Sequence, residues 1–472
     1  MFQRKPLAAL VAGALMTMAA GANAATTYFD NFTPIAASAG PTANEAFPLT
    51  LSSPNFTQLT IADRATNNAL VPGSDSGNWD MITANESGPD TGRYLFMPYE
   101  TGAGGVQRID LQNPNYNTRT VTIVAPGTQG FVAGDASRWT PWGSYITAEE
   151  SWGTGSQKGR LFEVTNSTTA AANGGNFIQR NVVPRVSHEG LAFDSQKSMY
   201  FIDELNGGSI YKYVSSNANA ATGDQYFDKG QTFVAKVDGG SNANAVGAIT
   251  WEAITTTTGT ANAATFSAMV NLGGGNFALD GRAAANLVGG TDYQRPEDLE
   301  IQVAANGDER MYIATTTTNE VYMFNLTTGQ SSLFANTSTI DLATGLAVGS
   351  GLRSPDNLAI DAEGNIYIIE DRNGGVDDDI WFAKDINKDG DLLDAGEGLA
   401  RWASNGTVGS EFTGLYFDKL DPNKAYVNIQ HPASGIDRTI QITAVPEPET
   451  YAMLGAGLGM LALMRSRRRK TA

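Results

Sequence analysis

Acidic residues recur at one place in this sequence, just ahead of short apolar segments. Four segments share the layout, SHEGLAFD from 187, RPEDLEI from 295, SPDNLAID from 354 and EFTGLYFD from 411, and they contribute Glu189, Glu297, Asp356 and Glu411. If each segment is an inner strand around one axis, these carboxylates converge. Facing carboxylates do not all stay ionised without a counter-charge, and Ca²⁺ prefers oxygen-rich cages. The pattern predicts a shared metal site.

Acidic pairs form a second set of candidates, at the ends of the strands that follow. They are Glu149-Glu150, Asp203-Glu204 and Glu370-Asp371. Such a pair chelates a cation in one interpretation and faces water in the other, and the sequence leaves both open.

Three further side chains lie inside or after these motifs. His188 and His431 are the only histidines, and a neutral imidazole either binds metal, orients a carboxylate or acts as a structural hydrogen-bonder. Arg295 is suited to bidentate capture of a phosphate. The alternative for Arg295 is a structural ion pair with Glu297 or Asp298.

A separate calcium loop is predicted in DINKDGDLLDAGE, residues 385–397. Its candidate ligands alternate around Gly390 and are Asp385, Asn387, Asp389 and Asp391. The second half departs from the usual spacing, because Gly396 occupies the twelfth position and Glu397 follows it. We expect a structural clip on a long loop, apart from any catalysis.

Composition limits the class of protein. The chain has 472 residues, 52 of them Gly, with 17% charged residues, a formal charge of -18 and no Cys. An acidic surface excludes nucleic acid as a partner, and the lack of Cys excludes disulfides and thiolate sites. No GxSxG, Walker, Rossmann or HExxH motif occurs, which excludes the commonest serine hydrolase, nucleotide-binding and zinc-protease assignments.

The body predicts an all-β fold. Short period-two strands are separated by Gly, Asn and Asp turns, in about six similar units that each contain an aromatic middle strand. This layout favours a β-propeller, six-bladed and with loop insertions, over a β-helix or a sandwich. In a propeller the first strand of each blade is innermost, which would bring the acidic positions together at one mouth of a central channel.

The two ends indicate export. Arg4 and Lys5, an apolar run and Ala22-Asn23-Ala24 predict a signal peptide over residues 1–24, removed by signal peptidase. The propeller body is expected over 25–443. Residues 444–472 resemble a PEP-CTERM sorting signal, with Pro-Glu-Pro, an apolar helix and a basic cluster. That resemblance implies transient membrane contact through the helix, cleavage by an exosortase-type protease, and a final place in the periplasm, at the outer surface or outside the cell.

The motifs TPWGSYITAEE, SHEGLAFD, QRPEDLEI, SPDNLAID and EFTGLYFDKLDPNKAYVNIQHPA resemble the PhoX-type alkaline phosphatases, in this order and over most of the body. The resemblance implies a six-bladed, exported, calcium-dependent propeller that pairs iron with calcium to hydrolyse phosphate monoesters. It implies iron ligands at Glu189 and Glu297, a phosphate contact at Arg295, and calcium ligands drawn from Glu149, Asp356, Glu370 and Glu411.

One departure from that family concerns the metal. The phosphatases carry an iron-binding cysteine ahead of TPWG, whereas this chain reads GDASRWTPWG, which puts Asp135 or a neighbour in that role. A carboxylate in place of a thiolate favours Ca²⁺, Mg²⁺ or Mn²⁺ over an iron pair.

We therefore expect an exported metal-dependent phosphoesterase, with Arg295, Glu297 and Glu189 as catalytic residues and a small phosphorylated substrate. Ca²⁺ is the expected cofactor, beside a second metal such as Fe, Mn or Mg. His188, His431 and Asp298 are candidates for orienting the metal ligands. Two alternatives stay open, a non-catalytic calcium-binding propeller of the cell surface or matrix, and a sugar-lactone hydrolase on a similar propeller.

Overall fold

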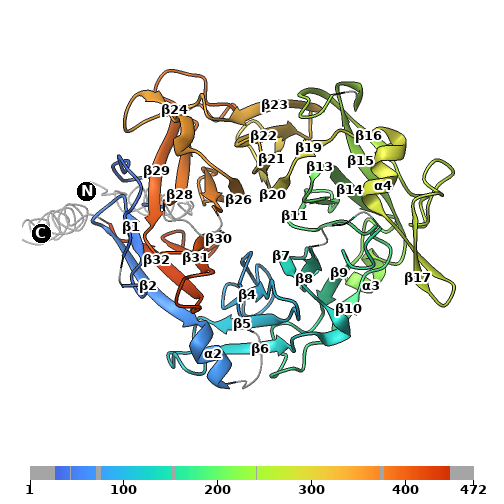
Figure 1. The fold of residues 1–472 in the computed structure, drawn as a ribbon, viewed down its shortest axis with the longest axis horizontal. Helices are drawn as coiled ribbons and strands as arrows, with labels where there is room; N and C mark the ends of the chain where they lie inside the picture. Colours follow the sequence, from blue (N-terminus) through green and yellow to red (C-terminus); the bar gives the residue numbers. More distant parts are fainter. Residues whose placement is uncertain are drawn as a thin grey trace, which may run out of the picture.

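The computed structural model of the chain describes residues 27–446, except 43, 71–75, 151–152, 154, 241 and 373–376. Antiparallel strands dominate this part, and they form a ring around one central axis (Figure 1). The predicted all-β, propeller-like fold is confirmed. The predicted signal peptide and nearly all of the sorting tail lie outside the described residues.

The strands pair into units of four, which we name A to F. From the axis outward they follow chain order, except that β2 is the outer strand of unit F. Unit A contains β3 (Thr83–Ala84), β4 (Tyr94–Pro98), β5 (Val106–Asp110) and β6 (Thr120–Val124). Unit B contains β7 (Gly134–Trp139), β8 (Tyr145–Glu149), β9 (Leu161–Val164) and β10 (Phe177–Gln179). Unit C contains β11 (Leu191–Phe193), β12 (Met199–Ile202), β14 (Ile210–Ser215) and β15 (Gly230–Val237). Unit D contains β20 (Pro296–Val303), β21 (Glu309–Thr315), β22 (Glu320–Asn325) and β23 (Gln330–Ala335). Unit E contains β26 (Pro355–Ile360), β27 (Ile366–Glu370), β28 (Asp378–Lys384) and β29 (Gly398–Asn405). Unit F contains β30 (Glu411–Phe417), β31 (Lys424–Gln430), β32 (Arg438–Ala444) and β2 (Phe56–Asp63).

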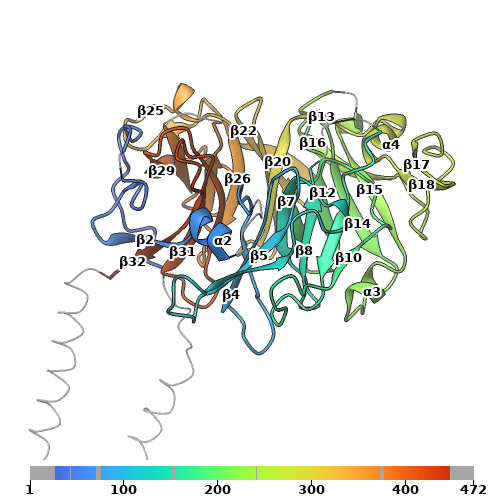
Figure 2. The same cartoon turned by 60° about the horizontal axis from the view of Figure 1, so that its bottom comes forward.

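Insertions modify this plan between units C and D. β16 (Gly247–Ala253) pairs with both β15 and β23 and joins the two units into one nine-stranded sheet. For this reason the expected number of six blades stays a prediction. A hairpin of β17 (Met269–Gly273) and β18 (Asn276–Leu279) projects beyond the ring near α4 (Gly281–Val288), as Figures 1 and 2 show.

The remaining elements are short and lie around the units. They are β1 (Leu49–Leu51), which pairs with β29; β13 (Asn206–Gly208), which pairs with β19 (Tyr293–Gln294); β24 (Ile340–Asp341), which pairs with β29; β25 (Leu346–Ala347), which pairs with β24; and the helices α2 (Arg64–Leu70) and α3 (Gly223–Tyr226). Within the described ranges, helices are too short or too polar to cross a membrane.

The ring is closed by strands from opposite ends of the chain. β2 forms the outer strand of unit F and pairs antiparallel with β32, from Phe56 opposite Ala444 to Asp63 opposite Arg438. An exposed sheet edge is thereby removed, because the N-terminal strand completes the C-terminal unit. Figure 1 shows the blue β2 beside the red β32.

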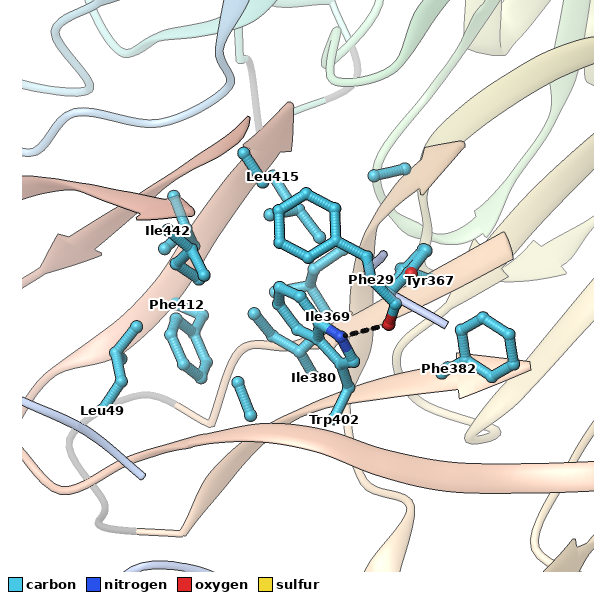
Figure 3. Close-up of a cluster of buried hydrophobic side chains, with 14 of the residues drawn as sticks. Phe29, Leu49, Tyr367, Ile369, Ile380, Phe382, Trp402, Phe412, Leu415 and Ile442 are labelled. Carbon is cyan, nitrogen blue, oxygen red and sulfur yellow. Dashed lines mark hydrogen bonds between the residues drawn. The ribbon is translucent and has the colours of Figure 1, made fainter. Parts of the chain in front are cut away.

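Aromatic side chains fill the interface between units E and F (Figure 3). Phe29 makes edge-to-face contacts with Phe56, Trp402 and Phe417 at centroid distances of 5.4–5.5 Å. The Trp402 indole N–H donates to the Phe29 carbonyl at 3.1 Å. These edge-to-face pairs pack units E and F against each other.

Truncation of Trp402 tests this packing. We expect Trp402→Ala to lower the free energy of unfolding by about 3–5 kcal/mol, since it removes a fully buried indole and its hydrogen bond. Chemical denaturation measures the change. Leu346→Ala, at a side chain that is 70% exposed, is the control and should change stability by less than about 0.5 kcal/mol. Equal losses in the two variants would show that this interface does not stabilise the ring.

Candidate metal centre

A β-bulge lies at the start of the inner strand in units B, D, E and F. The register shifts at the same place in each, at Gly134/Ser137, Pro296/Leu299, Pro355/Leu358 and Thr413/Leu415. A bulge leaves residues outside the ladder and re-aims their side chains. Asp135, Glu297 and Asp356 lie within these bulges, which explains why a strand-forming sequence carries an acid there.

Three predicted ligands converge near the axis from successive inner strands. Oxygen atoms of Glu189, Glu297 and Asp356 lie within 4.8 Å of one another, and all three side chains are buried. Glu189 precedes β11, while Glu297 and Asp356 are the second residues of β20 and β26. This separation suits carboxylates that share a cation.

Two more acids extend the group on the side of units A and B. Asp135 and Asp80 are both buried, and burial, followed by the charge of Asp80, raises the pKa of Asp135. Asp135 was predicted, whereas Asp80 was missed. Asp80 precedes β3, the inner strand of unit A. This strand has only two residues, so the sequence there lacks the apolar run that marks the inner strands of the other units.

The second strands contribute a further ring of side chains just past their last residues. These are Glu100, Glu150, Glu204, Thr316, Asp371 and His431. Burial raises the pKa of Glu150, while its interactions with Glu204, Arg295 and Glu100 lower it in part. The Thr316 hydroxyl donates to Glu297 Oε1, which links this ring to the inner acids.

Glu149 and Glu370 were predicted as ligands, but the structure uses them elsewhere. Glu149 accepts from Arg160 Nε at 2.7 Å and from the Val132 N–H at 3.2 Å. Glu370 accepts from the Trp381 indole at 2.9 Å and from the Arg353 N–H at 2.8 Å. Successive strand residues point to opposite faces, so the first acid of each pair turns into the unit.

The next residues, Glu150 and Asp371, replace Glu149 and Glu370 beside the cluster. Burial is the main cause that raises the pKa values of Glu297, Asp356 and Glu411, and the charge of Asp371 raises all three further. In unit C the same rule holds, because Asp203 binds Arg282 at 2.6 Å while Glu204 faces Arg295.

Arg295 brings a positive charge to the cluster. Its Nη2 lies 2.8 Å from Glu204 Oε1 and its Nε lies 2.9 Å from Glu297 Oε1. The residue has a left-handed φ of 57°, which breaks the strand direction just before the bulge. The side chain is 26% exposed, so the guanidinium lies between the buried acids and solvent.

Glu411 lies two residues before Thr413, the unit F counterpart of Glu297. Arg295 likewise lies two residues before Glu297, so Glu411 occupies the position in unit F that Arg295 occupies in unit D. His431 Nε2 lies 3.2 Å from Glu411 Oε1 and is partly exposed. Burial, followed by the charge of Asp371, raises the pKa of Glu411 to about 11.

The cluster carries more negative charge than its described neighbours neutralise. Burial raises the pKa of Glu297 to about 7, despite Arg295, and that of Glu100 to about 8. Several buried oxygens accept no hydrogen bond within the described ranges, namely Asp80 Oδ1, Asp135 Oδ1, Glu204 Oε2, Glu297 Oε2 and Glu411 Oε2. Orphaned oxygens in an oxygen-only set fit hard cations such as Ca²⁺ or Mg²⁺.

His188 and Asp298 contact residues of neighbouring strands. The His188 ring is fully buried, its centroid lies 5.3 Å from that of Phe201, and burial lowers its pKa to about 3. Asp298 accepts from the N–H groups of Leu299 at 2.7 Å and Leu358 at 3.0 Å, so it ties β20 to β26. Asp298 thus supports the bulge that carries Glu297.

The predicted calcium loop lies at the outer end of unit E, between β28 and β29. Asp385 accepts from the N–H groups of Asp389 and Gly390, and Asn387 donates to Asp389 and Asp394. Glu397, beyond the predicted set, is buried and accepts from the Ile386 and Asp394 N–H groups. The oxygens of the loop are thus gathered around one turn, and calcium there stays a prediction.

Comparisons with known proteins agree with this geometry. The sequence matches the family described as alkaline phosphatase PhoX over residues 128–433, and the PEP-CTERM protein-sorting motif over 444–469. The sorting motif indicates export to the cell envelope or surface. No curated protein matches the chain.

A solved structure shows a similar fold. Pseudomonas fluorescens PhoX, solved with vanadate as a transition state analogue, superposes with a TM-score of 0.59 at 16% identity, over 88% of this chain and 98% of that chain. A protein of unknown function from Bacteroides thetaiotaomicron gives a TM-score of 0.42 at 12% identity, over 82% of this chain and 76% of that chain. Since the family match spans more than half of its length, the chain belongs to the alkaline phosphatase PhoX family.

Proposed function

We propose that this protein is an exported, metal-dependent phosphoesterase that hydrolyses phosphate monoesters at the carboxylate cluster. The observation that carries the proposal is the buried convergence of Glu189, Glu297 and Asp356 beside Arg295. Hard cations and a guanidinium at one point form an arrangement that binds a phosphate dianion. Membership of the PhoX family supports the same substrate class.

The residues of the cluster would have two roles, to hold cations and to orient Arg295. Glu189, Glu297 and Asp356 would hold one cation. A second cation would take ligands from Asp80, Asp135 and Glu150, whose charges influence one another. Bound there, the cations would neutralise the substrate phosphate and supply a more acidic water. Glu204 and Glu297 orient the Arg295 guanidinium, whose positive charge would stabilise the phosphate oxygens as charge builds on them.

The donor set determines which metals are proposed. Asp135 is buried where the related phosphatases carry a cysteine, and its Oδ1 accepts no hydrogen bond within the described part of the chain. We assign Ca²⁺ to the cluster, with Mg²⁺, Mn²⁺ or Fe as the second metal, because carboxylates favour hard cations. Calcium in the 385–397 loop belongs to the same proposal, as a clip on β28 and β29.

The processing partners complete the proposal. Signal peptidase would cut after Ala24, and an exosortase-type protease acts at the PEP-CTERM motif.

The alternative function is a non-catalytic calcium-binding propeller, which the replacement of a metal-binding cysteine by Asp135 favours. An activity assay separates the two.

A chromogenic phosphate monoester tests the enzyme. We expect turnover with Ca²⁺ that is lost in chelator, and a decrease in kcat/KM of about 10²-fold to 10³-fold for Arg295→Ala, because a charge-stabilising donor is lost. Glu297→Gln should abolish turnover and metal binding together. The control, Lys229→Ala, alters an exposed side chain and should leave kcat/KM unchanged. Stoichiometric calcium with no turnover of any ester would establish the binding alternative.

Paired substitutions test which acid of each pair binds metal. We expect Glu150→Gln to weaken calcium binding measured by titration calorimetry. Glu149→Gln should chiefly lower the melting temperature, because it leaves Arg160 without its carboxylate. The opposite pattern would return the ligand role to Glu149.

Acid titration of the metal-free protein tests the burial of the cluster. The pKa values of Glu297 and Glu100 are raised in the folded state, so the folded chain binds more protons than the unfolded chain above about pH 4.5. In chelator we expect the free energy of unfolding to fall as the pH rises from about 5 to about 8, and calcium to remove the loss. Denaturation curves at several pH values measure this. A metal-free stability that stays constant or rises over this range would contradict the buried cluster.

A further inference from the structure

Three basic side chains gather at one end of unit B, and we call Lys158, Arg160 and Arg185 the basic group. Arg160 directly precedes β9, which pairs with the end of β8 from its first residue. The end of β8 is in turn opposite the start of β7, where Asp135 lies. The basic group is therefore at the same end of the ring as the carboxylate cluster, but on the outer strands of the unit.

Backbone carbonyls hold these side chains together. The Gly130 carbonyl accepts from Lys158 Nζ at 2.7 Å and from Arg160 Nη2 at 2.8 Å. Arg185 Nη1 donates to the carbonyls of Gln157 and Lys158, the second at 3.3 Å. Burial, followed by the charge of Arg160, lowers the pKa of Arg185, so the two guanidinium groups repel each other.

The basic group has more positive charge than its acidic neighbours neutralise. Glu149 binds Arg160 through Nε at 2.7 Å and through Nη2, whereas Lys158 and Arg185 form no ion pair with any residue that the structure describes. The backbone of Asp280 lies beside that of Arg185, but its carboxylate accepts from two backbone N–H groups. Three cations thus share one paired carboxylate, and a dianion would match the surplus of positive charge.

Arg185 also has donors left for a ligand. Its Nε and Nη2 donate to no residue in the described ranges, and the side chain lines a cavity of about 400 Å³. Arg160 and Arg180 line the same cavity, where Glu163 holds Arg180 at 2.8 Å, and Phe277 of β18 lies in its wall. The described residues that line this cavity include no acid. A cavity of this size accommodates an organic molecule and not merely a bare ion.

We infer that the basic group binds the phosphate group of a ligand at the end of the ring that carries the carboxylate cluster. A guanidinium binds phosphate through parallel N–H donors, and Arg185 has Nε and Nη2 available for this contact. The formal charge of the chain is -18, so most of its surface repels phosphorylated molecules. The basic group attracts them beside the cluster. The site does not depend on the phosphoesterase proposal, because none of its residues belongs to the carboxylate cluster.

Equilibrium dialysis with radiolabelled inorganic phosphate tests the site in the calcium-loaded full chain. We expect the unchanged protein to bind phosphate at a second site besides the metal cluster. Arg185→Ala should raise the dissociation constant of this second site by about 10-fold to 100-fold, because charge-assisted hydrogen bonds are lost. Lys158→Ala is a second variant, and it should weaken the same site by a smaller factor because it removes only a neighbouring charge.

Two controls accompany the dialysis. Arg93→Ala makes the same substitution at an arginine of unit A that pairs with Asp110, and it should leave phosphate binding unchanged. Arg295→Ala should keep the phosphate that Arg185→Ala loses, so failure of the enzyme proposal leaves this test intact. Unchanged phosphate binding in Arg185→Ala would overturn the inference. So would a melting temperature that phosphate raises equally in Arg185→Ala and in the unchanged protein, since Arg185 would then only hold backbone carbonyls.

Kinetics distinguish the two sources of the phosphate group, which are a substrate with a second phosphate and free inorganic phosphate. This comparison rests on the proposed phosphoesterase activity and uses a chromogenic monoester beside a sugar bisphosphate. If the group belongs to the substrate, Arg185→Ala raises KM for the bisphosphate alone and leaves kcat unchanged. If it is free phosphate, both KM values stay unchanged and only the binding measured by dialysis is lost. An equal loss of kcat for both esters would overturn the inference, because it marks a structural role for Arg185.

Discussion

Repulsion between buried carboxylates is the constraint on which this structure depends. At the interfaces between strands, acids such as Glu149 and Asp203 are matched by Arg160 and Arg282. Toward the axis the acids outnumber the basic groups that reach them, and Arg295 is shared between Glu204 and Glu297. Charge that the chain does not neutralise internally must be met by protons or by ions from solution. An arrangement that is costly for a bare polypeptide thus becomes a receptor for cations.

The fold provides this arrangement with ordinary strand geometry. Bulges at the start of inner strands turn Glu297 and Asp356 out of the ladder. Neighbouring residues then hold the bulges in place, since Asp298 binds the N–H of Leu358 and Asn357 accepts from the N–H of Gly414 at 2.6 Å. Each unit therefore positions its neighbour's acid, and the cluster depends on the whole ring.

Much of this site could be predicted from sequence because its acids precede recognisable strands. Glu189, Glu297 and Asp356 have that signature, and they converge. Asp80 lacks it, since it precedes a two-residue strand. The choice between Glu149 and Glu150, or between Glu370 and Asp371, depends on which face of a strand each residue occupies. A pair of adjacent acids carries no information on that choice, because a shift of one residue exchanges the two faces.

The closure of the ring by β2 and β32 has a mechanical consequence. β32 ends at Ala444, where the sorting motif begins, so a force applied through the tail acts along this strand. The antiparallel β2 holds it through pairs that extend from Ala444 to Arg438. Tension directed along paired strands loads many hydrogen bonds together rather than one after another. A tethered domain of this design resists shear at its attachment point, and the N-terminal strand acts as the clamp.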